Sequence, residues 1–146
     1  MPIDVDAEVL IRRPRAEVAA WVTDPANDRT WILALSEVNQ VTDPPIRVGS
    51  RVERVARFLG RRIVYLNEVV EYEAESRLVM KSVKAPFPMA VRYEFTDAEG
   101  GATRVRVGNK GGSGIVSTLT GPLMGWMVNR QVKKDLLLLK SVLEAE

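Results

Sequence analysis

Three side chains in this sequence have the right chemistry to act on the carbonyl group of a small molecule. Arg54 and Tyr65 lie in two neighbouring stretches that alternate apolar and polar residues, and Tyr93 lies in a later stretch of the same kind. Guanidinium and phenol groups donate hydrogen bonds, so together they suit recognition and polarisation of a carbonyl or carboxylate inside a cavity. This combination favours ligand binding over strong acid–base chemistry.

The absence of two residue types excludes much of enzyme chemistry. The 146 residues include no His and no Cys, which removes Ser-His-Asp and Cys-His nucleophiles, disulfides, and zinc, haem or iron–sulfur centres held by thiolate or imidazole. Only an all-oxygen site for Mg²⁺ or Ca²⁺ stays open. Asp4, Asp6 and Glu8 do not make one, because strand alternation sets them in a row on an outer face. We therefore expect no metal and no cofactor.

The charge balance argues against a nucleic-acid partner. The chain has 21 basic and 19 acidic side chains and a formal charge of +2. Its pI of about 9.1 is high because, without His, almost nothing titrates between the carboxylates and the amines. Arginines cluster at 12–15 and 51–62, but no aromatic row is interleaved with them. A solvated sheet face explains them better than a groove that follows phosphates.

Length and the N-terminal residues set expectations for organisation and location. A chain of this length predicts a single domain over residues 1–146. The opening MPIDVDAEVLIRR carries acids where a signal peptide carries positive charge, and no apolar run approaches the roughly 18–20 residues of a membrane span. We expect a cytoplasmic monomer or homodimer without stable membrane insertion.

Hydrophobic periodicity predicts an α+β fold. An alternating strand covers 3–11, a short helix begins at Pro14, and Asp24 or Asn27 caps a second short helical turn that carries Trp31. Short turns then separate further strands in an antiparallel meander. We expect these strands at roughly 35–42, 50–58, 62–72, 77–84, 89–96 and 102–109.

A long helix is expected from about Pro122 to Glu146, with Pro122 in its first turn. Val128, Val132, Leu136, Leu139 and Leu143 recur on one face of it. This helix is the only element large enough to cover the apolar face of a seven-stranded sheet. A curved sheet that grips it can leave a cavity between helix and sheet.

Hairpin pairing sorts the strand residues onto two faces, because directly opposed residues share a face. A two-residue turn at 59–60 sets Arg54 opposite Tyr65 and Val52 opposite Asn67. Turns at 73–76, 85–88 and 97–101 then give the pairs Tyr72–Arg77, Val69–Met80, Asn67–Ser82, Met80–Tyr93 and Phe95–Thr103. The apolar face collects Val52, Ala56, Phe58, Ile63, Val69, Leu78, Met80, Met89, Val91, Phe95, Val105 and Val107. The opposite face collects Arg57, Arg62, Glu68, Lys81, Arg92, Glu94, Arg104 and Arg106.

Polar residues on the apolar face are the candidate ligand contacts, since buried polar groups need partners. They are Arg54, Tyr65, Asn67, Ser82, Tyr93 and Asn109. We add Met80 and Met89 from the same face, and Trp31, which lies at a cavity mouth or in the core. Arg54 has two further interpretations: it reaches solvent at an open end of the sheet, or a bulge turns it outward.

The apolar face carries almost no carboxylate, which ranks binding slightly ahead of catalysis. Asp24 and Asp28 are acids at a possible cavity edge, although helix capping explains Asp24.

The stretch Gly108–Gly114 lacks the residue order of a phosphate-binding loop, and it predicts a flexible link to the long helix. The apolar stretch 115–127 fits helix packing on the sheet, a lid, a dimer contact or a membrane-touching edge.

The sequence resembles the START-like, or SRPBCC, superfamily with the helix-grip fold, in its polyketide cyclase/dehydrase-like branch. The resemblance spans nearly the whole chain. It is carried by Ile11-Arg12-Arg13-Pro14, Glu17-Val18, Trp21-Val22, Asp24-Pro25, Trp31, Val48-Gly49, Gly60-Arg61-Arg62, Val69-Val70-Glu71-Tyr72, Gly101-Ala102-Thr103-Arg104-Val105, Leu136, Leu139-Lys140 and Leu143-Glu144. Almost all of these are structural positions, so they say little about substrate.

The resemblance implies a cavity that takes a hydrophobic small molecule such as a lipid, sterol, quinone, hormone or polyketide. The first hypothesis is a non-catalytic binding module for a ring-containing ligand. The second is a polyketide cyclase or dehydratase that promotes aldol-type cyclisation through Arg and Tyr side chains and bound water; only Arg54, Tyr65 and Tyr93 have the right type and facing. A third is an interaction protein that docks on a larger assembly.

Overall fold

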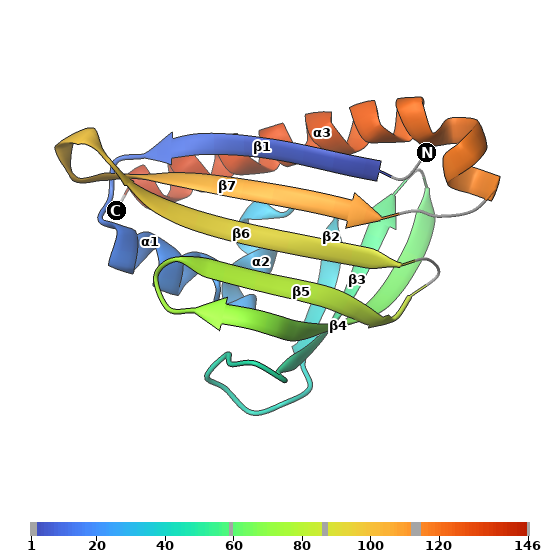
Figure 1. Ribbon diagram of the computed structural model, residues 1–146, viewed down its shortest axis with the longest axis horizontal. Helices are drawn as coiled ribbons and strands as arrows, with labels where there is room; N and C mark the ends of the chain where they lie inside the picture. Colours follow the sequence, from blue (N-terminus) through green and yellow to red (C-terminus); the bar gives the residue numbers. More distant parts are fainter. Residues whose placement is uncertain (1–2, 59, 86–87, 112–114, 146) are drawn as a thin grey trace.

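The architecture is described from a computed structural model, shown in Figure 1. It describes residues 3–58, 60–85, 88–111 and 115–145, and no side chain at 3–4, 58, 111 or 115–125. The strands are β1 (Ile3–Ile11), β2 (Leu35–Gln40), β3 (Arg51–Phe58), β4 (Arg61–Glu73), β5 (Arg77–Lys84), β6 (Met89–Ala98) and β7 (Ala102–Gly111). The helices are α1 (Arg15–Val22), α2 (Asp28–Trp31) and α3 (Ile115–Glu144), with short 3-10 turns η1 (Pro25–Asn27) and η2 (Glu99–Gly101).

One antiparallel sheet holds all seven strands in the order β1-β7-β6-β5-β4-β3-β2. β1 pairs with β7, so the first strand lies beside the last, and the other strands follow as a meander. The sheet curls, with α3 running alongside β1 and the short helices α1 and α2 near one end (Figure 1). The helix-grip fold predicted from the sequence is confirmed.

The expected β3–β4 register is confirmed, with Arg54 opposite Tyr65 and Val52 opposite Asn67. The pairs Val69–Met80 and Asn67–Ser82 between β4 and β5 are also as expected, but Tyr72 pairs with Leu78 rather than with Arg77. A bulge between Val69 and Glu71 causes this shift. The extra residue lets both Val69 and Tyr72 pack toward the core, while Val70 points outward.

Two other hairpins are shifted by two residues from the expected register. Met80 pairs with Val91 rather than Tyr93, and Phe95 pairs with Val105 rather than Thr103. In the second hairpin the strands run on to Ala98–Ala102, because Gly100 and Gly101 adopt positive φ in a tighter connection than expected. In the first, backbone pairing ends at Lys81–Ala90, and at the next position the Met89 amide donates to the Ser82 hydroxyl at 2.9 Å. A two-residue shift preserves the face of every side chain.

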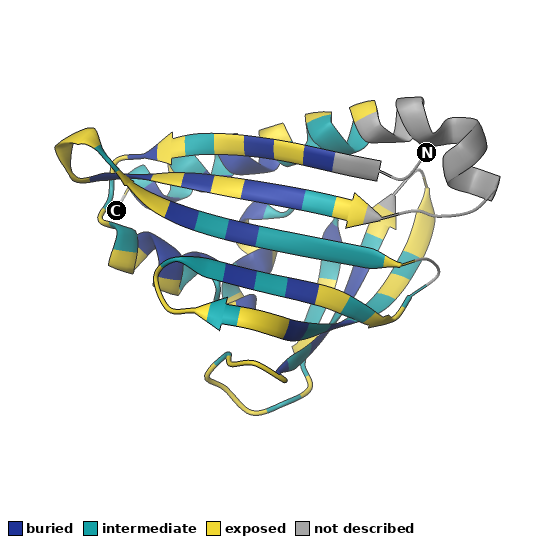
Figure 2. Cartoon of the chain, in the orientation of Figure 1, coloured by how far each residue is buried: buried dark blue, intermediate teal, exposed yellow. Residues whose placement is uncertain are grey.

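The burial pattern in Figure 2 follows the predicted faces. The expected apolar face is buried at Val52, Val69, Leu78, Met80, Phe95, Val105 and Val107, and half-buried at Ala56, Ile63, Met89 and Val91; the side chain of Phe58 lies outside the described residues. The opposite face carries ion pairs such as Arg92–Asp6 (2.8 Å) and Arg104–Glu8 (3.2 Å). The buried side of α3 contributes Leu136, Leu139 and Leu143 to the core.

Two boundary expectations are wrong. The long helix begins at Ile115, so Pro122 lies inside it rather than in its first turn. Gly108 is not in a loop: β7 continues to Gly111, and Gly108 is buried beneath the outer-face pair. A Cβ there would lie 2.7 Å from Nη2 of Arg92 and 3.0 Å from Oδ1 of Asp6, so a larger residue would displace the ends of these two side chains. Residues 112–114 of the expected link lie outside the described residues.

The helices between β1 and β2 form as the sequence suggests. Pro14 precedes α1, and the Asp24 carboxylate accepts a hydrogen bond from the Ala26 amide, which caps η1. This turn leads directly into α2, so Asp28 and Trp31 enter the interior together. Among the helices that the structure describes, none is long and apolar enough to cross a membrane.

The grip of α3 on the sheet predicts the effect of one substitution. Leu139 is fully buried, with 0% of its surface exposed, so Leu139→Ala should lower the free energy of unfolding by about 2–5 kcal/mol. Leu137 on the same helix is 61% exposed, and Leu137→Ala should change it by less than about 0.5 kcal/mol. Chemical denaturation measures both, and equal losses would contradict this packing.

Candidate functional site

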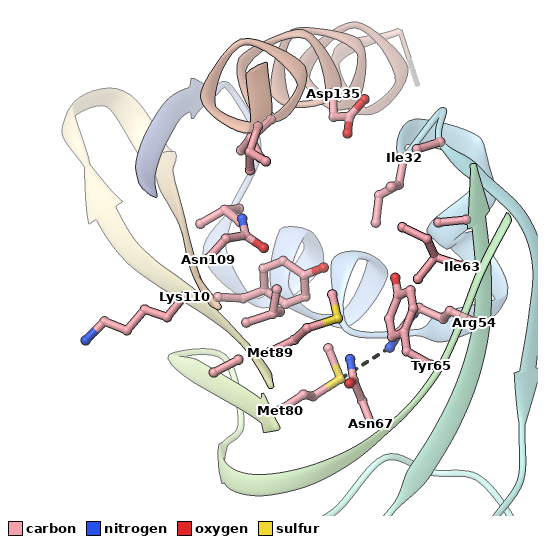
Figure 3. Close-up of a pocket in the computed structure, with 18 of the residues that line it drawn as sticks. Ile32, Arg54, Ile63, Tyr65, Asn67, Met80, Met89, Asn109, Lys110 and Asp135 are labelled. Atoms are coloured by element: carbon pink, nitrogen blue, oxygen red, sulfur yellow. Dashed lines mark hydrogen bonds between the residues drawn. The ribbon is translucent and has the colours of Figure 1, made fainter. Parts of the chain in front are cut away.

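A cavity of about 240 Å³ lies between the sheet and α3 (Figure 3). Its walls come from β3 to β7, from α3, and from the segment that joins α2 to β2. Most of the wall is apolar, with polar groups at a few points. The lining residues are Trp31, Ile32, Ala34, Arg54, Ala56, Ile63, Tyr65, Asn67, Met80, Met89, Ala90, Val91, Tyr93, Val107, Asn109, Lys110, Val128, Val132 and Asp135.

Arg54 faces the interior and is held there by Asp28. Arg54 is 5% exposed and Asp28 is 2% exposed. Nε of Arg54 donates to Oδ2 of Asp28 at 2.8 Å, and Nη2 lies 2.8 Å from the same oxygen. Nη1 donates to the thioether sulfur of Met80 at 3.6 Å, the dashed line in Figure 3. Of the interpretations left open by the sequence, solvent exposure and an outward bulge are therefore both wrong.

Burial and charge oppose each other in this ion pair. Burial, the largest single cause, acts to lower the pKa of Arg54, but Asp28 together with the nearby Tyr93 and Tyr65 outweighs it, so the pKa of the guanidinium is raised. Burial also raises the pKa of Asp28 above its usual range, with Arg54 acting in the opposite direction. An ion pair with two 2.8 Å contacts is strongly coupled, so both groups carry their charges at neutral pH.

Two tyrosines sit near this pair. Burial, the larger cause in each case, raises the pKa of Tyr65 and of Tyr93 above the usual range, so both phenols stay protonated and can donate hydrogen bonds. The Tyr65 hydroxyl is directed into the cavity in Figure 3. Tyr93 packs against Trp31 with ring centroids 6.1 Å apart and an interplanar angle of 56°, which fixes one aromatic wall.

Two buried polar atoms of the wall lack a partner among the described residues. One is the indole Nε1 of Trp31, a donor, and the other is the side-chain oxygen Oδ1 of Asn67, an acceptor. Buried polar groups of proteins are nearly always hydrogen-bonded, and leaving one unpaired costs about 1–3 kcal/mol. Both residues line the cavity through other atoms, while these two atoms are themselves buried.

Asp135 brings a carboxyl into the cavity from α3. It is 5% exposed; Oδ1 accepts hydrogen bonds from Nε2 of Gln131 at 3.0 Å and from the Leu33 amide at 3.5 Å. Burial raises its pKa to about 6, although these two hydrogen bonds act in the other direction. The expectation that the cavity is nearly free of carboxylates is therefore wrong, since it considered only the sheet.

Eight of the nine predicted contact residues line the cavity. They are Trp31, Arg54, Tyr65, Asn67, Met80, Met89, Tyr93 and Asn109. Ser82 is not among the lining residues: its hydroxyl accepts a hydrogen bond from the Met89 amide at 2.9 Å and closes the end of the β5–β6 hairpin. Trp31 also belongs to the core, being 2% exposed. Their contacts with a ligand remain predictions.

Sequence reasoning missed Asp135 and did not connect Asp28 with Arg54. A signal for Asp135 was present, because it follows Val132 by three residues and Val128 by seven, on the inward side of the expected helix. Asp28 was noted only as a possible acid at a cavity edge. Its role depends on Arg54, which lies 26 residues further along the chain.

The chain matches a family model described as polyketide cyclase/dehydrase and lipid transport, over residues 2–144. No curated protein matches it in sequence.

Several solved structures share its fold. TTHA0849 from Thermus thermophilus is 23% identical, with a TM-score of 0.83 over 97% of each chain. A START superfamily protein from Mycobacterium smegmatis is 12% identical, with a TM-score of 0.83 over 97% of each chain. The Zhui aromatase/cyclase from Streptomyces sp. R1128 is 12% identical, with a TM-score of 0.80 over 99% of this chain and 94% of that one. At these identities the likeness shows the fold.

The raised pKa of Asp135 predicts a pH-dependent change in stability. The ordinary pKa is 3.8 and the folded value is about 6, so between these values the folded chain holds a proton that the unfolded chain releases. The wild type therefore loses stability as pH rises through this window, by up to about 3 kcal/mol. Asp135→Asn keeps the acceptor oxygen and removes the ionisation, so its stability relative to the wild type should increase between about pH 4 and pH 7.

Denaturation curves of both proteins at the two pH values measure this difference. Asp43→Asn, the same change in an exposed loop, serves as the control and should show no such gain. A stability difference between Asp135→Asn and the wild type that stays constant with pH would contradict the buried, proton-binding state of Asp135.

Proposed function

The chain belongs to the polyketide cyclase/dehydrase and lipid transport family, and from this premise we propose that it binds a hydrophobic, ring-containing small molecule in the cavity between the sheet and α3. The ligand is polyketide-, lipid- or quinone-like. One observation carries the proposal: an apolar cavity is lined by a small set of converging polar residues. Such walls are typical of small-molecule sites.

The composition of the wall favours a ring system. Trp31 and Tyr93 form a tilted aromatic pair, and Tyr65 lies on the facing strand β4. Met80 and Met89 add polarisable thioethers, which adapt their shape and pack well on aromatic rings. A cavity of about 240 Å³ lies just below the usual range of about 300–1,000 Å³ for ligand sites, which suits a small molecule of two or three fused rings.

A matched pair of tyrosine variants tests the binding site. Methyl naphthyl ketone is a suitable probe, since it has two fused rings and one carbonyl. Tyr65→Phe removes a hydroxyl directed into the cavity, so the ketone should bind about 2- to 10-fold more weakly, the equivalent of one neutral hydrogen bond. Tyr72→Phe removes a hydroxyl from the same strand outside the cavity lining and should leave affinity unchanged.

Calorimetric titration of the full chain measures both affinities. Arg54 is less suitable for this test, because its removal leaves Asp28 buried and unpaired, at a cost of about 3–5 kcal/mol to folding. Mass spectrometry of molecules that copurify with the chain identifies a natural ligand. Equal weakening by both tyrosine variants, or no binding of the ketone at all, would contradict the proposed site.

A second candidate function is that of a polyketide cyclase or dehydratase, and Asp135 is the observation that favours it. Aldol-type cyclisation needs a base that removes a proton from the carbon beside a carbonyl, and a donor that polarises that carbonyl. A carboxyl with a pKa of about 6 has the proton affinity of a useful base near neutral pH, and it enters from α3, on the other side of the cavity from Tyr65 (Figure 3). Arg54 and the two tyrosines would supply the donors.

Exchange of solvent deuterium into the methyl group of the same ketone distinguishes the two functions. An enzyme of this kind should accelerate the exchange, and Asp135→Asn should abolish the acceleration while the ketone still binds. The rate should rise with pH through about 6, as the carboxylate forms. Exchange at the buffer rate by the wild type, with normal binding, leaves binding alone as the function.

A further inference from the structure

We propose that the cavity selects uncharged, carbonyl-bearing ligands and excludes their carboxylate analogues, because Asp28 already neutralises the one cation that faces the interior among the described residues. This inference rests on the proposed function and specifies its ligand class. It is carried by the arrangement of the charged groups around the cavity.

The positive charge of Arg54 is fully engaged before any ligand arrives. Two of its nitrogens contact the same Asp28 oxygen at 2.8 Å, and both residues are almost completely buried. Asp28 lies behind Arg54, outside the cavity lining. The wall therefore contains a guanidinium whose Nη1 is directed at the lining residue Met80, while its other two nitrogens face Asp28 and its charge is compensated there.

The remaining charged groups of the described wall do not offer a second cation. Lys110 is the other basic lining residue; Figure 3 shows its side chain directed away from the cavity, and it is exposed. Asp135 faces the cavity from α3 and becomes negative above a pH of about 6. At neutral pH these groups sum to a neutral or slightly negative interior.

A ligand carboxylate would add a second buried anion to a cation that already has one. Burying a charge without a free partner costs several kcal/mol, and the ionised Asp135 would add repulsion. A carbonyl brings no charge. The carbonyl oxygen can accept a hydrogen bond from Nη1 of Arg54. Among the described residues, Nη1 donates only to the Met80 sulfur at 3.6 Å, and sulfur is a weak acceptor. The Tyr65 hydroxyl, which is directed into the cavity, is a further neutral donor.

A pair of nearly isosteric probes tests the selection at neutral pH: methyl naphthyl ketone and the naphthoate substituted at the same ring position. The wild-type chain should bind the ketone at least about 10-fold more tightly than the naphthoate, which corresponds to about 1.4 kcal/mol. This comparison uses no variant, so it does not depend on whether a substitution folds.

The decisive variant is Asp28→Asn. The asparagine oxygen still accepts a hydrogen bond from Arg54, but the guanidinium charge is no longer compensated. Naphthoate affinity should rise by about 10-fold or more, while ketone affinity changes little. A gain of binding cannot come from partial unfolding. Asp43→Asn, in the exposed loop, is the matched control and should change neither affinity.

Each outcome decides the proposal. Wild-type affinity for naphthoate equal to or above that for the ketone overturns it, while the proposed binding function stands. A gain in naphthoate affinity from Asp135→Asn but not from Asp28→Asn also overturns it, because the exclusion then comes from repulsion by Asp135. Failure of both probes to bind the folded wild type overturns the binding function itself.

Discussion

This structure depends on one constraint: a single long helix must cover the inner face of a seven-stranded sheet. Neighbouring strands lie about 4.8 Å apart and a helix is about 10 Å across, so one helix packs over only a few strands. α3 packs mainly along β1 (Figure 1), with Leu136, Leu139 and Leu143 in the core. The inner surface of β3 to β6 is only partly covered, and the cavity forms there.

The fold was predictable because strand alternation is a local property with a period of two. The inward facing of Arg54, Tyr65 and Asn67 followed from counting along hairpins, and it survived register errors in two of them, since each error was an even number of residues. The bulge after Val69 was not predictable in this way. It depends on how Tyr72 packs in three dimensions, which the alternating pattern does not contain.

Only the part of the candidate site that lies on the strands was predictable from the sequence. Asp28 belongs to a four-residue helix, too short to show a periodicity, and its meaning depends on a partner in β3. Asp135 lies among apolar residues of α3, and the sequence pattern alone does not show that it faces a cavity. Both carboxyls change the chemistry: one turns Arg54 from a free cation into a neutral pair, and the other makes proton transfer available in a chain without histidine.

The pairing of β1 with β7 has a consequence for biosynthesis. Ile11 lies opposite Thr103 in the register, and Val5 opposite Asn109, so β1 leaves the ribosome long before β7, its neighbour in the described sheet, is made. During that interval the nascent chain exposes the apolar side of β1 and an unpaired strand edge, the kind of surface on which aggregation begins. The alternating acids of β1 form ion pairs with β7 and β6 in the finished sheet. On the nascent chain the same charges oppose aggregation of the unpaired strand.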